Sequence, residues 1–160
     1  MRRVISAPAG FDVSAHAARV ASGVLLIPDP SRELCRHYGF RTLHGVPRQL
    51  QKRLRRQLIR EHAEALFENA DCVCDHSVFA CLADWMRWLW SETPAEEWEG
   101  VLVDAYPAVQ RSEQIHHVIA APHAGRGFDA AGAKQLDKLM RNLYRDFACE
   151  ARVTEVSIGP

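Results

Sequence analysis

The stretch from 2 to 22, RRVISAPAGFDVSAHAARVAS, has the order of a strand, a Pro/Gly turn and a helix. That order is typical of a loop that holds phosphate at the start of a helix. A loop of the form G-x-x-x-x-G-K-S/T needs glycines for close backbone approach, a lysine on the phosphates and a hydroxyl on magnesium. Aligned on Pro8, the four key positions hold Ser6, Phe11, Asp12 and Val13. A phosphate-binding loop at this place would be a degenerate Walker A loop, because it lacks each residue type that the usual chemistry requires.

The carboxylate at the lysine position has a direct electrostatic consequence. Asp12 repels the triphosphate that a lysine would attract, so we expect no ordinary ATP binding at this loop. An ordinary turn between a strand and a helix, with no binding role, is the alternative interpretation. If the loop does bind a ligand, its candidate residues are Ser6, Gly10, Asp12 and Ser14.

Four further charged residues follow expected strands and are candidates to line a cleft for a small polar ligand. Asp29 and Arg32 follow the second strand, Asp75 follows the third, and Arg126 lies in the loop after the fourth. The alternative is structural: Asp29 forms a turn with its flanking prolines, Arg32 pairs locally, Asp75 caps the next helix and Arg126 is solvated. The sequence leaves both interpretations open.

The cysteines and histidines do not predict a metal site. Cys72 and Cys74 share a face of one strand, but zinc needs further converging ligands. His116 and His117 are adjacent on a strand and point to opposite faces. Five cysteines without a C-x-x-C pair are typical of reduced thiols in a cytosol. No G-x-S-x-G elbow or similar signature supports a serine or cysteine nucleophile.

Apolar runs and turn residues predict alternating strands and helices within one domain, residues 1–160. The pattern predicts an α/β fold in three layers, with five parallel strands and helices on both faces. The expected strands are 4–7, 24–27, 71–75, 115–121 and 153–158. The first expected helix has Asp12 or Ser14 as its N-cap, and the second, 32–38, has Ser31 as its N-cap. The remaining expected helices are 47–68, 77–90, part of 95–111 and 130–149.

Two helices suggest binding surfaces. The helix 77–90 is apolar on nearly every side, which is typical of a buried helix or one covered by a partner. Its candidate interaction residues are Trp85, Trp88 and Trp90. The helix 48–60 is rich in arginine and is a candidate for RNA binding, although a solvated charged face is the commoner explanation.

Taken in order, these motifs resemble the small P-loop kinases related to nicotinamide-riboside kinase, often described as AAA-type ATP-binding domains. The resemblance covers nearly the whole chain. PDPSRE supplies Asp29 and Arg32 where the family usually has E-x-x-R, and RRQLIRE supplies Gln57 and Glu61 before the third strand. The resemblance implies a P-loop kinase fold.

At several positions of the motifs that carry the resemblance, this chain departs from the residue that the family uses for its chemistry. Asp75-His76-Ser77 stands at an Asp-Arg-Ser type motif, in which the aspartate serves the metal or the attacking hydroxyl. The arginine of that motif is His76 here, and the acidic residue before Gly125-Arg126 is Ala124. Because the loop lysine and hydroxyl are also missing, the resemblance implies the fold more firmly than the activity, and Asp75 is only a vestigial catalytic candidate.

The leading hypothesis is a pseudokinase that acts as a protein-interaction or ligand-sensing module, without a cofactor or a metal. The first alternative is an ATP- and magnesium-dependent kinase of a nucleoside or other small molecule with atypical nucleotide binding. The second is the RNA binder, which the balance of twenty basic and twenty acidic residues does not favour. We expect a cytoplasmic protein that binds no membrane and has a protein partner or a second copy as partner.

Overall fold

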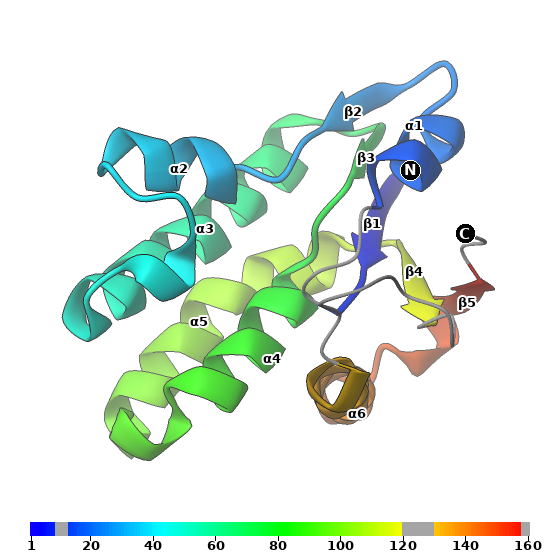
Figure 1. The fold of residues 1–160 in the computed structure, drawn as a ribbon. Helices are drawn as coiled ribbons and strands as arrows, with labels where there is room; N and C mark the ends of the chain where they lie inside the picture. Colours follow the sequence, from blue (N-terminus) through cyan, green and yellow to red (C-terminus); the bar gives the residue numbers. More distant parts are fainter. Residues whose placement is uncertain (9–12, 120–129, 158–160) are drawn as a thin grey trace.

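The computed structural model describes residues 1–8, 13–119 and 130–157. Within them, one parallel sheet has the strand order β2-β3-β1-β4-β5 (Figure 1). The strands are β1 (Arg2–Ser6), β2 (Leu25–Ile27), β3 (Cys72–Cys74), β4 (Gln114–Ile119) and β5 (Val153–Ser157). The predicted parallel five-stranded sheet is confirmed, and each strand lies within about two residues of its predicted position.

Helices occupy the connections between the strands, as predicted. They are α1 (Ser14–Val20), α2 (Ser31–His37), α3 (Arg48–Glu68), α4 (Val78–Trp88), α5 (Ala95–Arg111) and α6 (Ala130–Asp146). In the described part of the chain, single turns of 3₁₀-helix follow α2, α4 and α6; they are η1 (Leu43–Gly45), η2 (Trp90–Glu92) and η3 (Glu150–Arg152). The helix α5 is helical throughout despite Pro107 in its interior, whereas only part of this segment was predicted to be helical.

Alternating strand residues divide the core between the two faces of the sheet. Val4 of β1 belongs to the larger core, which α3, α4, α5 and α6 cover. Its neighbour Ile5 belongs to a smaller core on the other face, where α1 contributes Ala17 and Ala21. Figure 1 shows α1 on one side of the sheet and the longer helices on the other. The fold therefore has the three layers that the sequence predicts.

The helix termini correct several predicted caps. Val13 is the N-cap of α1 and Pro30 that of α2, so Ser14 and Ser31 are the first helical residues and not caps. Asp75 does not cap α4, because the Ser77 hydroxyl accepts the hydrogen bond from the Ala80 amide at 3.1 Å. The predicted cap Asp12 lies outside the described residues.

Glycine ends the first two helices as predicted. Gly23 follows α1 with φ of 84°, and Gly39 follows α2 with φ of 79°. Only glycine adopts this left-handed backbone without a steric cost, which is why it commonly terminates a helix. In the part of the chain that the structure covers, none of the helices has both the length and the apolar character that a membrane span needs.

Candidate functional site

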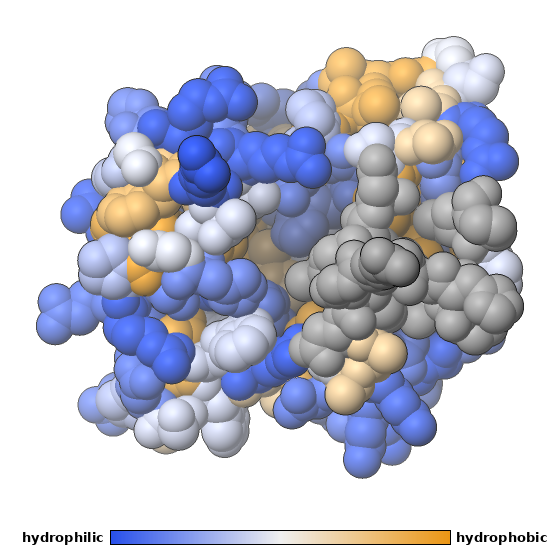
Figure 2. All heavy atoms as spheres, viewed as in Figure 1, coloured by the Kyte–Doolittle hydropathy of each residue, from blue (hydrophilic) through white to orange (hydrophobic). Residues whose placement is uncertain are grey.

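A cavity of about 630 Å³ lies at the carboxyl ends of β1, β2 and β3. Ala7 and Pro8 follow β1 and line it, Asp29 follows β2, and Asp75 follows β3. The opposite walls come from α2, η1, α3 and α4. The space-filling view shows a hollow near the centre of this face, with mostly hydrophilic side chains around it (Figure 2). This is the edge of a parallel sheet at which α/β proteins bind their ligands.

Asp29 is held in place by the residue that starts α2. Its carboxylate accepts hydrogen bonds from the Ser31 amide at 2.8 Å and from the Ser31 hydroxyl at 2.7 Å. Burial alone would raise the pKa of Asp29, but the nearby His76 and the Ser31 hydrogen bonds lower it below its ordinary value. Asp29 therefore places a fixed negative charge at the cavity wall.

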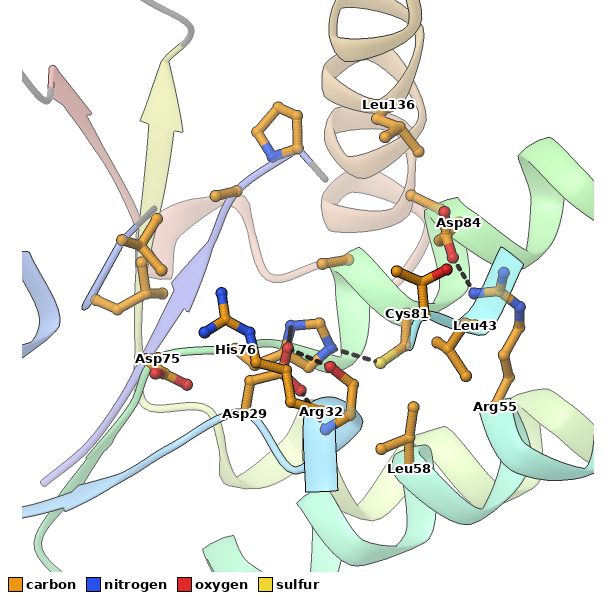
Figure 3. A pocket seen from close by; sticks show the side chains of 18 of the residues that line it. Asp29, Arg32, Leu43, Arg55, Leu58, Asp75, His76, Cys81, Asp84 and Leu136 are labelled. Atoms are coloured by element: carbon orange, nitrogen blue, oxygen red, sulfur yellow. Dashed lines mark hydrogen bonds and ion pairs between the residues drawn. The ribbon is translucent and has the colours of Figure 1, made fainter. Parts of the chain in front are cut away.

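His76 lies between two acidic groups and a thiol. Its Nδ1 is 4.0 Å from Asp29 Oδ2, and its Nε2 is 2.8 Å from the Cys81 sulfur (Figure 3). Desolvation would lower the pKa of His76, yet the Cys81 sulfur and then Asp29 and Asp75 raise it to about 10. The imidazole is therefore held in its charged form by its surroundings.

Asp75 is less readily ionised than Asp29. Burial, followed by the charge of Asp29, raises the pKa of Asp75 above its ordinary value. Its Oδ1 atom is buried and has no hydrogen-bond partner among the described residues. Two carboxyl groups whose pKa values are pushed in opposite directions can take different roles toward one ligand, one as a fixed charge and one as a proton carrier.

The far wall of the cavity carries a buried ion pair. Arg55 of α3 donates through Nη1 to Asp84 of α4, as Figure 3 shows. The Arg55 side chain is only 2% exposed, yet its Nε and Nη2 have no partner in the described part of the chain. The same holds for Oδ1 of Asp84. A ligand with hydrogen-bond acceptors and donors can satisfy these atoms.

A second histidine packs behind the first. His62 of α3 is 4% exposed, and its ring centroid is 6.3 Å from that of His76. Burial and then the charge of His76 lower the pKa of His62 to about 3. His62 is therefore neutral beside a charged His76, so the two rings do not repel each other.

Not all of the predicted site residues reach the cavity. Asp29, Arg32, Asp75 and Ser14 line it together, although Ser14 and Arg32 are largely exposed. Ser6 does not, because its hydroxyl is fully buried between Ser77, Tyr144 and Met140. The prediction of Ser6 as a ligand-binding residue is therefore corrected, while Gly10, Asp12 and Arg126 lie outside the described residues.

The tryptophans of α4 and η2 divide into one core residue and two surface residues. Trp85 is completely buried and donates from Nε1 to Thr93 Oγ1 at 3.0 Å, so it cannot belong to an interaction surface. Trp88 and Trp90 are 38% and 51% exposed. Trp90 also contacts Trp98, with ring centroids 5.3 Å apart. The predicted surface is therefore reduced to Trp88 and Trp90.

The basic helix directs its charges toward acidic residues of the same chain. Lys52 pairs with Glu97 at 2.6 Å, and Arg56 and Arg60 both pair with Asp104, at 2.7 and 3.1 Å. Charges already neutralised in this way attract nucleic acid less strongly.

Sequence reasoning missed four residues of the site. Cys81, Asp84, Arg55 and His62 come from the interiors of α3 and α4, where apolar patterning conceals single polar residues. For Cys81, the sequence feature that could have indicated its contact with His76 is the spacing of these two residues across the start of a helix. Residues five apart there can meet, because the histidine precedes the helix and its side chain can fold back over the first turn.

Comparison with protein-family models, with curated proteins and with solved structures finds no match to this chain. Across residues 1–8, 13–119 and 130–157, no group of three or more histidine, cysteine or acidic side chains is arranged to hold a metal ion. The chemistry of the site therefore has to be argued from its geometry.

Proposed function

We propose that this chain is a ligand-sensing module with the architecture of a P-loop kinase, and that it binds a small polar molecule without transferring phosphate. The observation that carries the proposal is the cavity at the carboxyl ends of β1, β2 and β3, lined by Arg55, Asp75 and Asp84 with their unpartnered polar atoms. Buried polar atoms are rarely left without partners, so their concentration at one cavity supports a bound ligand.

The charges at the cavity favour a ligand that presents both donors and acceptors. Asp29 and Asp75 offer carboxylate oxygens on one side, and Arg55 offers two N–H-bearing nitrogens on the other. Ribose hydroxyls and amide groups fit this combination, so nucleosides are the first class to test. No lysine is among the described residues that line the cavity. Phosphoryl transfer by a P-loop kinase relies on the loop lysine and on a hydroxyl that holds magnesium, and the sequence has Asp12 and Val13 at those positions, which supports binding without catalysis.

Isothermal titration calorimetry tests the proposal, with adenosine, nicotinamide riboside, ATP and GTP as probes, each with and without magnesium. We expect a nucleoside to bind with a Kd in the range of about 1–100 μM, independently of magnesium. Asp29→Ala should abolish the heat, because it removes the fixed charge of the wall. Glu64→Ala, an exposed change on α3 outside the cavity, is the matched control and should leave binding unaltered.

Two results would contradict the proposal in different ways. Absence of heat with every probe at millimolar concentration would remove nucleosides and nucleotides as ligands. Magnesium-dependent ATP binding with turnover that disappears in Asp75→Asn would instead establish the kinase alternative, with Asp75 as base or metal ligand. Binding of a protein partner through Trp88 and Trp90 remains a separate prediction.

A further inference from the structure

Cys81 differs from the other four cysteines of the chain in its surroundings. Each of the others is at most 1% exposed, and burial raises the pKa of each thiol. Cys81 is also buried, at 6% exposed, and like Cys35 it lines the cavity, but its sulfur lies 2.8 Å from the Nε2 atom of His76. A thiol in contact with a histidine can transfer its proton and become the nucleophilic thiolate.

The position of Cys81 in α4 adds to this effect. The residue lies in the first turn of the eleven-residue helix α4, which starts at Val78, and its amide donates to Ser77 O at 3.2 Å. The N-terminal end of a helix carries partial positive charge and stabilises an anion there. The thiolate would therefore be stabilised both by the imidazolium of His76 and by the helix.

The groups around His76 favour its charged form, in which the imidazole holds the proton taken from the thiol. Asp29 faces Nδ1 at 4.0 Å, Asp75 is next to it in the chain, and the neutral ring of His62 packs behind it. The Cys81 sulfur and, after it, these acidic neighbours raise the pKa of His76, as described above. Arg55 supplies an independent sign of a reactive site, since it lines the same cavity, is 2% exposed and has two nitrogens without partners among the described residues.

We propose that Cys81 is a nucleophilic thiol that reacts with small hydroperoxides entering the cavity, with His76 as the group that accepts and returns the proton. The thiolate sulfur attacks one peroxide oxygen, an S–O bond forms and the O–O bond breaks. The electron pair leaves with the second oxygen, which takes the proton from the His76 imidazolium. With hydrogen peroxide the products are a sulfenic acid on Cys81 and water, so the sulfur is oxidised by two electrons and the peroxide is reduced.

Figure 3 shows how the cavity would serve this reaction. The Cys81 side chain lies between His76 on one side and the Arg55–Asp84 pair on the other. The free N–H groups of Arg55 can donate to peroxide oxygens within this space. The inference goes beyond the proposed ligand binding and does not rest on it, because the oxidation needs no other ligand.

The test is oxidation of the folded protein by hydrogen peroxide at neutral pH, with trapping of sulfenic acid by dimedone and peptide mass spectrometry. In the wild-type chain we expect Cys81 to be labelled at least about tenfold faster than Cys35, which lines the same cavity. His76→Asn should slow labelling of Cys81 by at least about tenfold and remove the thiolate absorbance in the ultraviolet. Glu64→Ala, an exposed change on α3 outside the cavity, should leave the rate at Cys81 unchanged.

The comparison of labelling rates at Cys81 and Cys35 in the wild-type chain tests the proposal even if His76→Asn does not fold. Equal labelling of Cys81 and Cys35, or no labelling of Cys81 until the protein is unfolded by urea, would overturn the proposal. So would a folded His76→Asn variant in which Cys81 reacts within twofold of the wild-type rate. Since no ligand is present in the assay, none of these results bears on nucleoside binding.

Discussion

Two groups of polar side chains lie on the same side of the sheet, and they differ in how completely they are satisfied. In the first, hydrogen bonds run from Ser77 to Ser6, Tyr144, His117 and Asp137 without a break, at distances of 2.7 to 2.9 Å. In the second, at the cavity, Arg55, Asp75 and Asp84 each leave buried atoms without partners among the described residues. The two groups meet at Ser77, which directly follows His76.

The contrast separates polar residues that hold the fold from polar residues that are available to a ligand. The chain of hydrogen bonds through His117 joins β1 and β4 to α4 and α6, and Asp137 is further bonded to Arg141 at 3.0 Å. A fully satisfied buried network stabilises a unique packing. Unsatisfied atoms cost stability, and proteins keep them mainly where a function uses them.

The largest expected effect lies in the satisfied network. His117→Ala should lower the free energy of unfolding by about 3 kcal/mol, because it leaves Tyr144 and Asp137 without their shared partner and opens a cavity beside them. Urea denaturation measures the change. His116→Ala, next to it on the opposite face and half-buried, is the control and should cost less than about 1 kcal/mol. Equal losses in the two variants would show that the network has no special role.

An effect that is small near neutral pH and grows as the pH falls is expected from His62 behind the cavity. The pKa of His62 is about 3 in the folded chain and near its ordinary value of 6.5 in the unfolded chain, so the unfolded chain binds more protons as the pH falls below 6.5. The free energy of unfolding should therefore fall as the pH drops from 6.5 toward 3, by up to about 1.4 kcal/mol per pH unit. His62→Leu should remove that slope in urea unfolding measured at successive pH values. An unchanged slope in the variant would assign the acid sensitivity to other groups.

His76 affects the stability of the folded chain at alkaline pH. Its pKa is raised to about 10 in the folded chain, so its stabilising contribution is complete below its ordinary value and is lost as the pH rises toward 10. The wild-type chain should accordingly be most stable near neutral pH. His76→Asn should flatten the alkaline side of the stability profile. It should also make the acid slope of His62 shallower, because the charge of His76 contributes to the lowered pKa of His62.

The smallest expected effect on stability belongs to Asp75, and its sign is opposite. Because the folded chain raises the pKa of Asp75, the ionised carboxylate costs stability at neutral pH. Asp75→Asn should therefore raise the free energy of unfolding by less than about 1 kcal/mol. Thermal unfolding checks the sign, and Asp71→Asn, at an exposed ion pair with the N-terminus, is the control that should change little. A loss of more than about 1 kcal/mol in Asp75→Asn would place Asp75 with the structural network.

The elements of the fold were predictable because each is set by a local pattern. A stripe with i, i+4 spacing predicts α3, and its members are Leu50, Leu54, Leu58, His62 and Leu66. In the structure Leu50 is half-buried and the other four are buried. Gly23 and Gly39 predicted the ends of α1 and α2 through their backbone freedom. The convergence of Asp29, Arg32 and Asp75 at the carboxyl edge of the sheet also followed from the strand order, since parallel strands end at one edge.

The amino-acid sequence by itself therefore determined the alternation of strands and helices, their approximate bounds and the strand ends that form one wall of the cavity. Only the tertiary structure decided which side chains face that wall. The burial of Trp85, the contact between Cys81 and His76, and the pairing of Arg55 with Asp84 all depend on how α3 and α4 are rotated and packed. Helical periodicity reveals which face of a helix is apolar, but it does not reveal which neighbour that face meets.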